Sequence, residues 1–334
     1  MKKIFTLLVA MSMATSMMAQ MHGAMKFAGV STNTVNGQST PTPSDTIQFA
    51  MNGMTSGNIT FPEMKGMSTI PSFTVKDVAF TMDADHKVTF PEQTFSTTIT
   101  VNNEEKTITG SSLSGSYNMA DNSMTITAVF KYGKMPLELT YNITAYYVKP
   151  VTNSINVNVG GSYNYQNGNV TYNVRKYKDG DIEKVDVEIP EYSLENTLMG
   201  NLTLGTYTVK GLTYDETKGG YYHDYAGEGL KFHFKAEGGM MDADTDYEFL
   251  AGKNNNILVK YEGNKVTDII NNFQPGLMPF PITSTFYTTP STGISSIKNA
   301  AKLADGKMYN LSGQLVGEDY KGIVIVNGKK YLKK

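Results

Sequence analysis

Cysteine is absent from the 334-residue chain, which excludes disulfides and thiolate chemistry. Neither charge sign dominates, because 29 Lys and Arg residues stand against 31 Asp and Glu residues. This balance argues against a nucleic-acid-binding protein, which carries a basic patch. The sequence also lacks a phosphate-binding glycine loop, a dinucleotide fingerprint and a Gly-x-Ser-x-Gly nucleophile motif. These absences argue against an enzyme, and we expect no cofactor.

Long apolar runs are absent beyond the first 19 residues. Lys2 and Lys3 precede that run and small residues end it, which is typical of a secretory signal peptide. We predict cleavage after Ala19, with cleavage after Ala14 as the alternative. The run is shorter than the roughly 20 apolar residues that cross a bilayer comfortably. We therefore expect an exported mature chain without a transmembrane segment.

Apolar and polar residues alternate along many short segments. Every second residue is apolar from 124 to 132, and the pattern recurs from 137 to 145. A period of two predicts a strand with one buried face. Turn-prone pairs, such as those at 121–122 and 167–168, separate these segments. With no amphipathic helical pattern beside them, the segments predict an all-β fold of antiparallel strands.

An internal repeat is visible in one of these segments. Residues 73–80 (FTVKDVAF) align with residues 207–214 (YTVKGLTY), and in both the alternation shifts by one residue, at Asp77 and at Gly211. Such a shift would move every later side chain to the other face of the sheet. We therefore predict a β-bulge at the same place in both copies.

Two further pairs of segments follow the same order in each copy. An apolar-Pro-Glu sequence lies upstream, at 61–63 and 189–191, and a Gly-x-Met-Pro sequence lies downstream, at 133–136 and 276–279. Chance alone does not supply three matches in one order. We predict two related domains at 21–149 and 150–289.

These repeated motifs resemble those of the calycin-like β-barrel domains of exported Bacteroides-group proteins. The resemblance covers most of residues 21–289. It implies two tandem antiparallel barrels of about eight strands each, with an interior that can hold a cavity. Lipocalins proper carry a Trp near their first strand, whereas this chain has none.

The C-terminal part of the chain reads as a linker, 290–306, followed by a short β-segment, 307–334. The segment combines a Tyr-x-apolar-x-Gly strand, a Gly-led apolar strand and a basic end. It resembles the C-terminal sorting segments of the type IX secretion pathway, which implies a place on the cell surface or in the medium. The alternative is a β-hairpin that caps the second barrel.

Closely spaced carboxylates suggest a metal site at Asp242, Asp244 and Asp246, because Ca²⁺ prefers oxygen-rich loops. An EF-hand is excluded, since Tyr247 and Lys253 occupy the positions of its Gly and Glu. The alternative is an acidic turn entering a strand.

Aromatic residues are densest at Tyr221, Tyr222 and Tyr225, in a Gly-flanked segment. Exposed tyrosines can stack on sugars or anchor a protein, so we take these three as candidate ligand-binding residues. The alternative is packing against the mouth of a barrel. Separately, Asp45-Thr46-Ile47 fits an Asp-Thr-apolar O-glycosylation pattern of the same bacteria, which makes Thr46 a candidate modification site.

The sequence as a whole favours an exported, non-catalytic binding protein of the cell envelope. Its partner would be a small apolar ligand, a surface glycan or an envelope protein. The alternative is a structural or adhesive surface protein whose barrels are filled with side chains. An apolar pocket of about 300 Å³ or more in each barrel would favour ligand binding inside the barrels.

Overall fold

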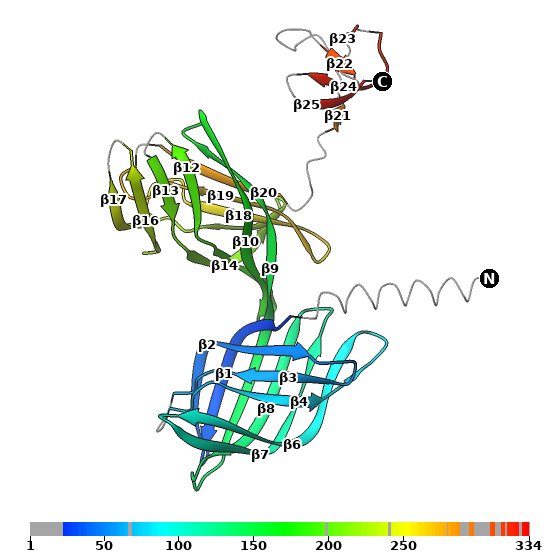
Figure 1. Cartoon of the computed structure of the whole chain (residues 1–334), viewed down its shortest axis with the longest axis vertical. Coiled ribbons are helices and arrows are strands. Elements are labelled where there is room, and N and C mark those ends of the chain that lie inside the picture. Colours follow the sequence, from blue (N-terminus) through cyan, green and yellow to red (C-terminus); the bar gives the residue numbers. More distant parts are fainter. Residues whose placement is uncertain are drawn as a thin grey trace, which may run out of the picture.

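The computed structural model contains only strands, turns and loops in the part of the chain that it describes (Figure 1). The all-β prediction is therefore confirmed. The described residues are 23–65, 69–197, 200–239, 242–278, 280–287, 294–296, 308–310, 315–317, 319–326 and 329–333. The predicted signal peptide and most of the predicted linker lie outside them.

The first barrel is an antiparallel meander whose last strand returns to its first. Hydrogen-bonded neighbours run β1-β2-β3-β4 and β5-β6-β7-β8-β9-β1. The ladder is interrupted between β4 and β6, where the Gln93 side-chain amide both donates to the Ala79 carbonyl and accepts from its N–H, at 2.9 Å each. The strands are β1 (Met25–Val35), β2 (Gln38–Met51), β3 (Ser56–Phe61), β4 (Phe73–Ala79), β5 (Thr81–Met82), β6 (Lys87–Val101), β7 (Glu104–Asn118), β8 (Ser123–Tyr132) and β9 (Leu139–Val159).

The second barrel is a closed ring of hydrogen-bonded strands. Its order is β9-β10-β11-β14-β15-β18-β19-β20, and β20 pairs again with β9. Closure leaves no edge strand exposed in this ring. The added strands are β10 (Tyr163–Asp179), β11 (Ile182–Ile189), β14 (Tyr207–Asp215), β15 (Gly220–Asp224), β18 (Asn256–Glu262), β19 (Lys265–Phe273) and β20 (Ile282–Tyr287).

Two smaller sheets accompany the barrels. One continues strands of the second barrel and has the order β12-β13-β16-β17. Its strands are β12 (Tyr192–Thr197), β13 (Gly200–Leu204), β16 (Lys231–Gly238) and β17 (Ala243–Glu248). The other, of order β21-β25-β24-β22-β23, contains the predicted C-terminal β-segment. Its strands are β21 (Ile294–Ser296), β22 (Met308–Asn310), β23 (Leu315–Val316), β24 (Gly322–Val326) and β25 (Lys329–Lys333).

Strand β9 belongs to both barrels. Its first part pairs with β8 and β1, and its second part pairs with β10 and β20. Figure 1 shows this strand running out of the lower barrel and into the upper one. Each barrel is therefore fixed to the other by continuous backbone rather than by a flexible linker.

The predicted bulge is confirmed in both copies. On β4, Lys76 and Asp77 oppose the single residue Asn58 of β3, and Asp77 has φ of 54°. Gly211, at the equivalent place on β14, has φ of 72°. In each copy the neighbouring strand caps the bulge, since the N–H of Asp77 donates to Asn58 (3.2 Å) and that of Gly211 donates to Asp186 (2.8 Å).

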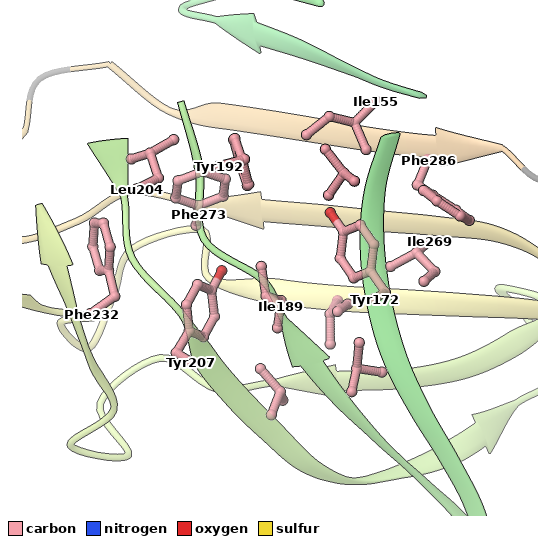
Figure 2. Close-up of a cluster of buried hydrophobic side chains, with 14 of the residues drawn as sticks. Ile155, Tyr172, Ile189, Tyr192, Leu204, Tyr207, Phe232, Ile269, Phe273 and Phe286 are labelled. Carbon is pink, nitrogen blue, oxygen red and sulfur yellow. The ribbon is translucent and has the colours of Figure 1, made fainter. Parts of the chain in front are cut away.

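Side chains fill both barrels. The first is packed with phenylalanines, including a stacked pair, Phe61 and Phe73, whose centroids are 4.9 Å apart. The second carries tyrosines as well, and Figure 2 shows Tyr172, Tyr192 and Tyr207 pointing into its interior among aliphatic and phenyl groups. The aromatic core residues of both barrels are almost entirely shielded from solvent. The interiors are thus occupied by the chain itself.

The bulge gives a test of backbone strain. A Cβ at Gly211 would meet no atom within 4 Å, so Gly211→Ala changes only the cost of a left-handed conformation. We expect the free energy of unfolding in urea to fall by about 1–2 kcal/mol. Gly53→Ala is the matched control, because Gly53 also has open space but no positive φ. Equal stability of the two variants would contradict the strained bulge.

Candidate ligand cleft between the barrels

A cleft of about 210 Å³ lies where the two barrels meet. The first barrel contributes the β7–β8 turn at residues 120–122 and Tyr146 of β9. The second contributes residues 176–178 and Glu183 of the β10–β11 hairpin, with Asn264 of the β18–β19 turn. Ligand sites are often found at domain junctions of this kind.

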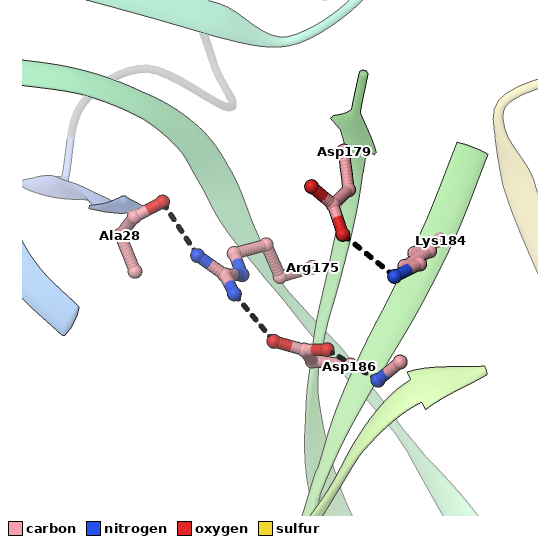
Figure 3. A network of polar contacts seen from close by, with 6 residues as sticks. Ala28, Arg175, Asp179, Lys184 and Asp186 are labelled. Carbon is pink, nitrogen blue, oxygen red and sulfur yellow. Dashed lines mark hydrogen bonds and ion pairs between the residues drawn. The ribbon is translucent and has the colours of Figure 1, made fainter. Parts of the chain in front are cut away.

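A hydrogen bond from Arg175, which also forms an ion pair in the second barrel, joins the two barrels beside the cleft. The Arg175 guanidinium donates to the Ala28 carbonyl of β1 at 2.9 Å and forms an ion pair with Asp186, whose other oxygen caps the bulge at Gly211 (Figure 3). The side chain of Asp186 is only 9% exposed, so solvent screens this pair weakly. The contact fixes the β10–β11 hairpin, which forms one wall of the cleft, against the first barrel.

Two tyrosines from different barrels meet at the cleft. The rings of Tyr146 and Tyr177 have centroids 6.2 Å apart and are tilted by 54°. The Arg175 guanidinium carbon lies 4.4 Å from the centroid of the Tyr177 ring, and this cation–π contact stabilises the position of the ring. Burial, with the nearby Asp186 carboxylate, raises the pKa of Tyr177 to about 12, so its hydroxyl stays protonated at neutral pH.

A second cluster supports the same wall. Lys176 forms an ion pair with Glu183 at 2.8 Å and lies 5.3 and 5.2 Å from the ring centroids of Tyr221 and Tyr261. The Tyr221 hydroxyl also donates to Glu183. Burial opposes ionisation of Glu183, yet Lys176 and the Tyr221 hydroxyl hold the pKa of its carboxyl below the usual value.

A small hollow of about 20 Å³ adjoins the cleft and shares Asn122, Lys176 and Asn264 with it. Lys149 of β9 lies in this hollow. Burial and the neighbouring Lys265 lower the pKa of the Lys149 ammonium. The cleft and the hollow together combine aromatic faces, side-chain amides and a half-buried cation, which suits a ligand that has polar groups beside a ring.

The three predicted tyrosines occupy different environments. They lie in or next to strand β15, not in a free loop. Tyr221 is buried and supports the cleft wall from behind, whereas Tyr222 is half-buried with the Lys218 ammonium 4.3 Å from its ring centroid. Tyr225 is fully buried, and its hydroxyl donates to Asn271 at 2.8 Å. A surface-stacking role for Tyr225 is therefore wrong, because its ring is part of the barrel core.

Tyr225→Phe tests this assignment. Removing the hydroxyl leaves the buried Asn271 oxygen without this donor, so we expect a loss of about 1–3 kcal/mol in the free energy of unfolding. Tyr222→Phe is the control, with an expected change within about 0.5 kcal/mol because that hydroxyl is not in the core. Chemical denaturation of both variants decides between them, and an unchanged Tyr225→Phe protein would refute the buried network.

The predicted acidic site contains a histidine. Asp246 of β17 lies directly opposite His233 of β16, and its carboxylate is 2.9 Å from Nδ1. Asp244, two residues away on β17, lies 3.1 Å from Nε2. Asp242 instead accepts the Gly238 N–H in the connecting turn at 3.0 Å. No group of three or more His, Asp or Glu side chains with metal-site geometry occurs in the described ranges. The carboxylates are exposed and bind a neighbouring side chain, as in the alternative of an acidic turn.

His233 gives a prediction on pH. The hydrogen bond to Asp246, followed by the charge of Asp244, raises the pKa of the imidazole above its ordinary value. Its stabilising effect is therefore complete below the unfolded-state pKa and is lost as pH rises through the higher folded-state pKa. NMR titration should give an elevated pKa that falls more in Asp246→Asn than in Asp244→Asn. Equal titration in all three proteins would contradict the geometry.

Thr46 lies half-buried on β2, and its N–H donates to Asp45 at 2.8 Å. The other Asp45 oxygen accepts from Ser31 (2.6 Å) and from the Tyr141 hydroxyl (3.1 Å). Asp45 therefore has a structural role in the first barrel. Modification of Thr46 stays a prediction.

Sequence reasoning missed the cleft residues. Tyr146, Lys149, Lys176 and Tyr177 lie in two stretches, one at the predicted domain boundary and one on the next strand. The sequence feature that could have indicated them is the pair Tyr146-Tyr147 followed by Lys149-Pro150, directly at that boundary.

The architecture is that of a tandem of two antiparallel β-barrels. A family model of the calycin-like β-barrel domain matches residues 20–145 and 152–289, so the chain belongs to that family. Among solved structures, a "putative outer membrane protein" from Bacteroides fragilis NCTC 9343 is 15% identical over 80% of this chain and 96% of its own, with a TM-score of 0.25. No curated protein matches the chain at a significant level. In the described ranges, no helix has the length and apolarity to cross a bilayer.

Proposed function

We propose that this protein is an exported, non-catalytic binding protein of the cell envelope that recognises a glycan on its outer surface, in the cleft between its barrels. The observation that carries the proposal is the filling of both barrel interiors by the chain's own aromatic side chains. A ligand inside either barrel would have to displace fully buried rings. The cleft at the junction, by contrast, is open and is lined by both aromatic and polar side chains.

Packing energetics support an external site. Burying one large apolar side chain contributes roughly 1.5–3 kcal/mol, so expelling several rings to admit an apolar ligand would cost more than most small ligands return. In the second barrel, Tyr207, Tyr225 and Asn271 also satisfy one another's polar groups at 2.6–3.4 Å. An apolar ligand there would leave these groups without partners.

The chemistry of the cleft supports a glycan. Tyrosine rings can contact the C–H face of a sugar, while amides and charged groups can bind its hydroxyls. Asn122 and Asn264 provide amides on opposite barrels, and Tyr146 and Tyr177 provide the rings.

Export and envelope placement are supported by the composition of the first 19 residues and by the motif of residues 307–334. A structural or adhesive role is the second candidate, because filled barrels make stable, rigid modules. The two candidates differ in whether a defined ligand occupies the cleft.

Protein purified from its source cells without detergent tests the proposal. We expect solvent extraction and native mass spectrometry to find no stoichiometric lipid, and glycan arrays to show binding that Tyr177→Ala removes. Tyr163→Ala, on the exposed β9–β10 hairpin, is the matched control and should bind normally. A retained apolar molecule at one per chain would overturn an external site, whereas a chain that binds no envelope glycan would support the structural role.

A further inference from the structure

Lys149 lacks a counter-ion in the part of the chain that the structure describes. Its ammonium donates to the Asn264 carbonyl at 3.3 Å, and no described carboxylate lies within the 4.0 Å of an ion pair. The residue is half-buried and has Lys265 nearby. An anion bound beside Lys149 would stabilise this half-buried cation and offset its repulsion by Lys265.

The other charges of the cleft do not supply that anion. Glu183 is already shared by Lys176 and Tyr221, and Asp121 accepts both the N–H and the hydroxyl of Ser123. Lys178 adds a further cation at the exposed rim. Lys176 and Lys178 balance Asp121 and Glu183 around the cleft, so Lys149 in the adjoining hollow leaves the two together with one positive charge in excess.

Charge and aromatic faces occur side by side. The hollow lined by Lys149 adjoins the larger cleft, and the two share the lining residues Asn122, Lys176 and Asn264. Its volume, about 20 Å³, accommodates a group about the size of one water molecule, such as one oxygen of a carboxylate. The larger cleft, with Tyr146 and Tyr177, has room for a ring next to that group.

We propose that the cleft binds a uronic acid unit, with the carboxylate at Lys149 and the sugar ring against Tyr146 and Tyr177. This inference rests on the glycan-binding function proposed above and specifies its ligand. An inorganic anion would use Lys149 but leave the tyrosines and amides unused. A neutral sugar would use the rings but leave Lys149 uncompensated.

Calorimetric titration of the mature chain tests the inference with galacturonate, glucuronate, galactose, glucose and inorganic phosphate as probes. We expect uronates to bind at least roughly tenfold more tightly than the matching neutral sugars, as is usual for a charge-assisted hydrogen bond. Added salt should weaken uronate binding. Trigalacturonate separates the two sources of this ligand, because tighter binding than the monomer indicates a unit within a polymer and equal binding indicates the free acid.

Lys149→Met separates the charge from the fold. We expect this variant to lose roughly tenfold in uronate affinity and to bind neutral sugars as before. Its thermal stability should stay equal or rise, because a desolvated cation is removed. Lys131→Gln, an exposed change on the first barrel, should leave uronate binding unchanged.

Three results would overturn the inference, namely neutral sugars that bind as tightly as uronates, phosphate that competes at equal concentration, or unchanged uronate affinity in Lys149→Met. Neutral glycans that bind in the cleft while uronates do not would reject the acidic ligand and leave the proposed glycan-binding function standing. If no saccharide bound in the cleft, both the uronic acid inference and the proposed glycan-binding function would be rejected.

Discussion

The shared strand β9 is the constraint on which the rest of the structure depends. Its 21 residues form one continuous strand that is the last strand of one barrel and the first strand of the next. A strand rises about 3.3 Å per residue, so the ends of the two barrels are forced close together. Turns that would otherwise face solvent, at residues 120–122 and 263–264, then form opposite walls of one cleft. The candidate site is a consequence of connecting two barrels through one strand.

Both copies contain the same capped β-bulge, but the capping residue makes different further contacts in each. In the first, Asn58 caps the bulge at Asp77 and lies within its own barrel. In the second, the residue at that place is Asp186, which caps Gly211 and also binds Arg175. Because Arg175 reaches the Ala28 carbonyl, a charge introduced at a repeated structural position has become a contact between copies. Arg is suited to this, since its planar guanidinium serves several acceptors at once.

Much of the fold could be predicted from period-two patterning, because a strand with one buried face records its orientation directly in the sequence. The bulge could be predicted as well, since a one-residue shift in the alternation requires an extra residue in the strand and recurs at Asp77 and Gly211. The site could not. Tyr225 and Tyr177 have the same side chain, and only the register of β10, β15 and β19 decides that one is in the core and the other in the cleft. The placement of Asp244 and Asp246 beside His233 likewise depends on how β16 pairs with β17.

The two cores differ in their residues, yet both are filled. Neither barrel interior is therefore a better place for a ligand than the cleft. Tyr141 of the first barrel and Ser284 of the second occupy equivalent positions, opposite Ala128 and Asn271 respectively. The space that the smaller Ser284 leaves is taken by Tyr172, whose hydroxyl lies 3.5 Å from the serine. At this position a loss of volume is matched by a gain from another strand, as close packing requires. Residues at the junction are free of that requirement. Their side chains can change without emptying a core, so the cleft can vary while both barrels stay filled.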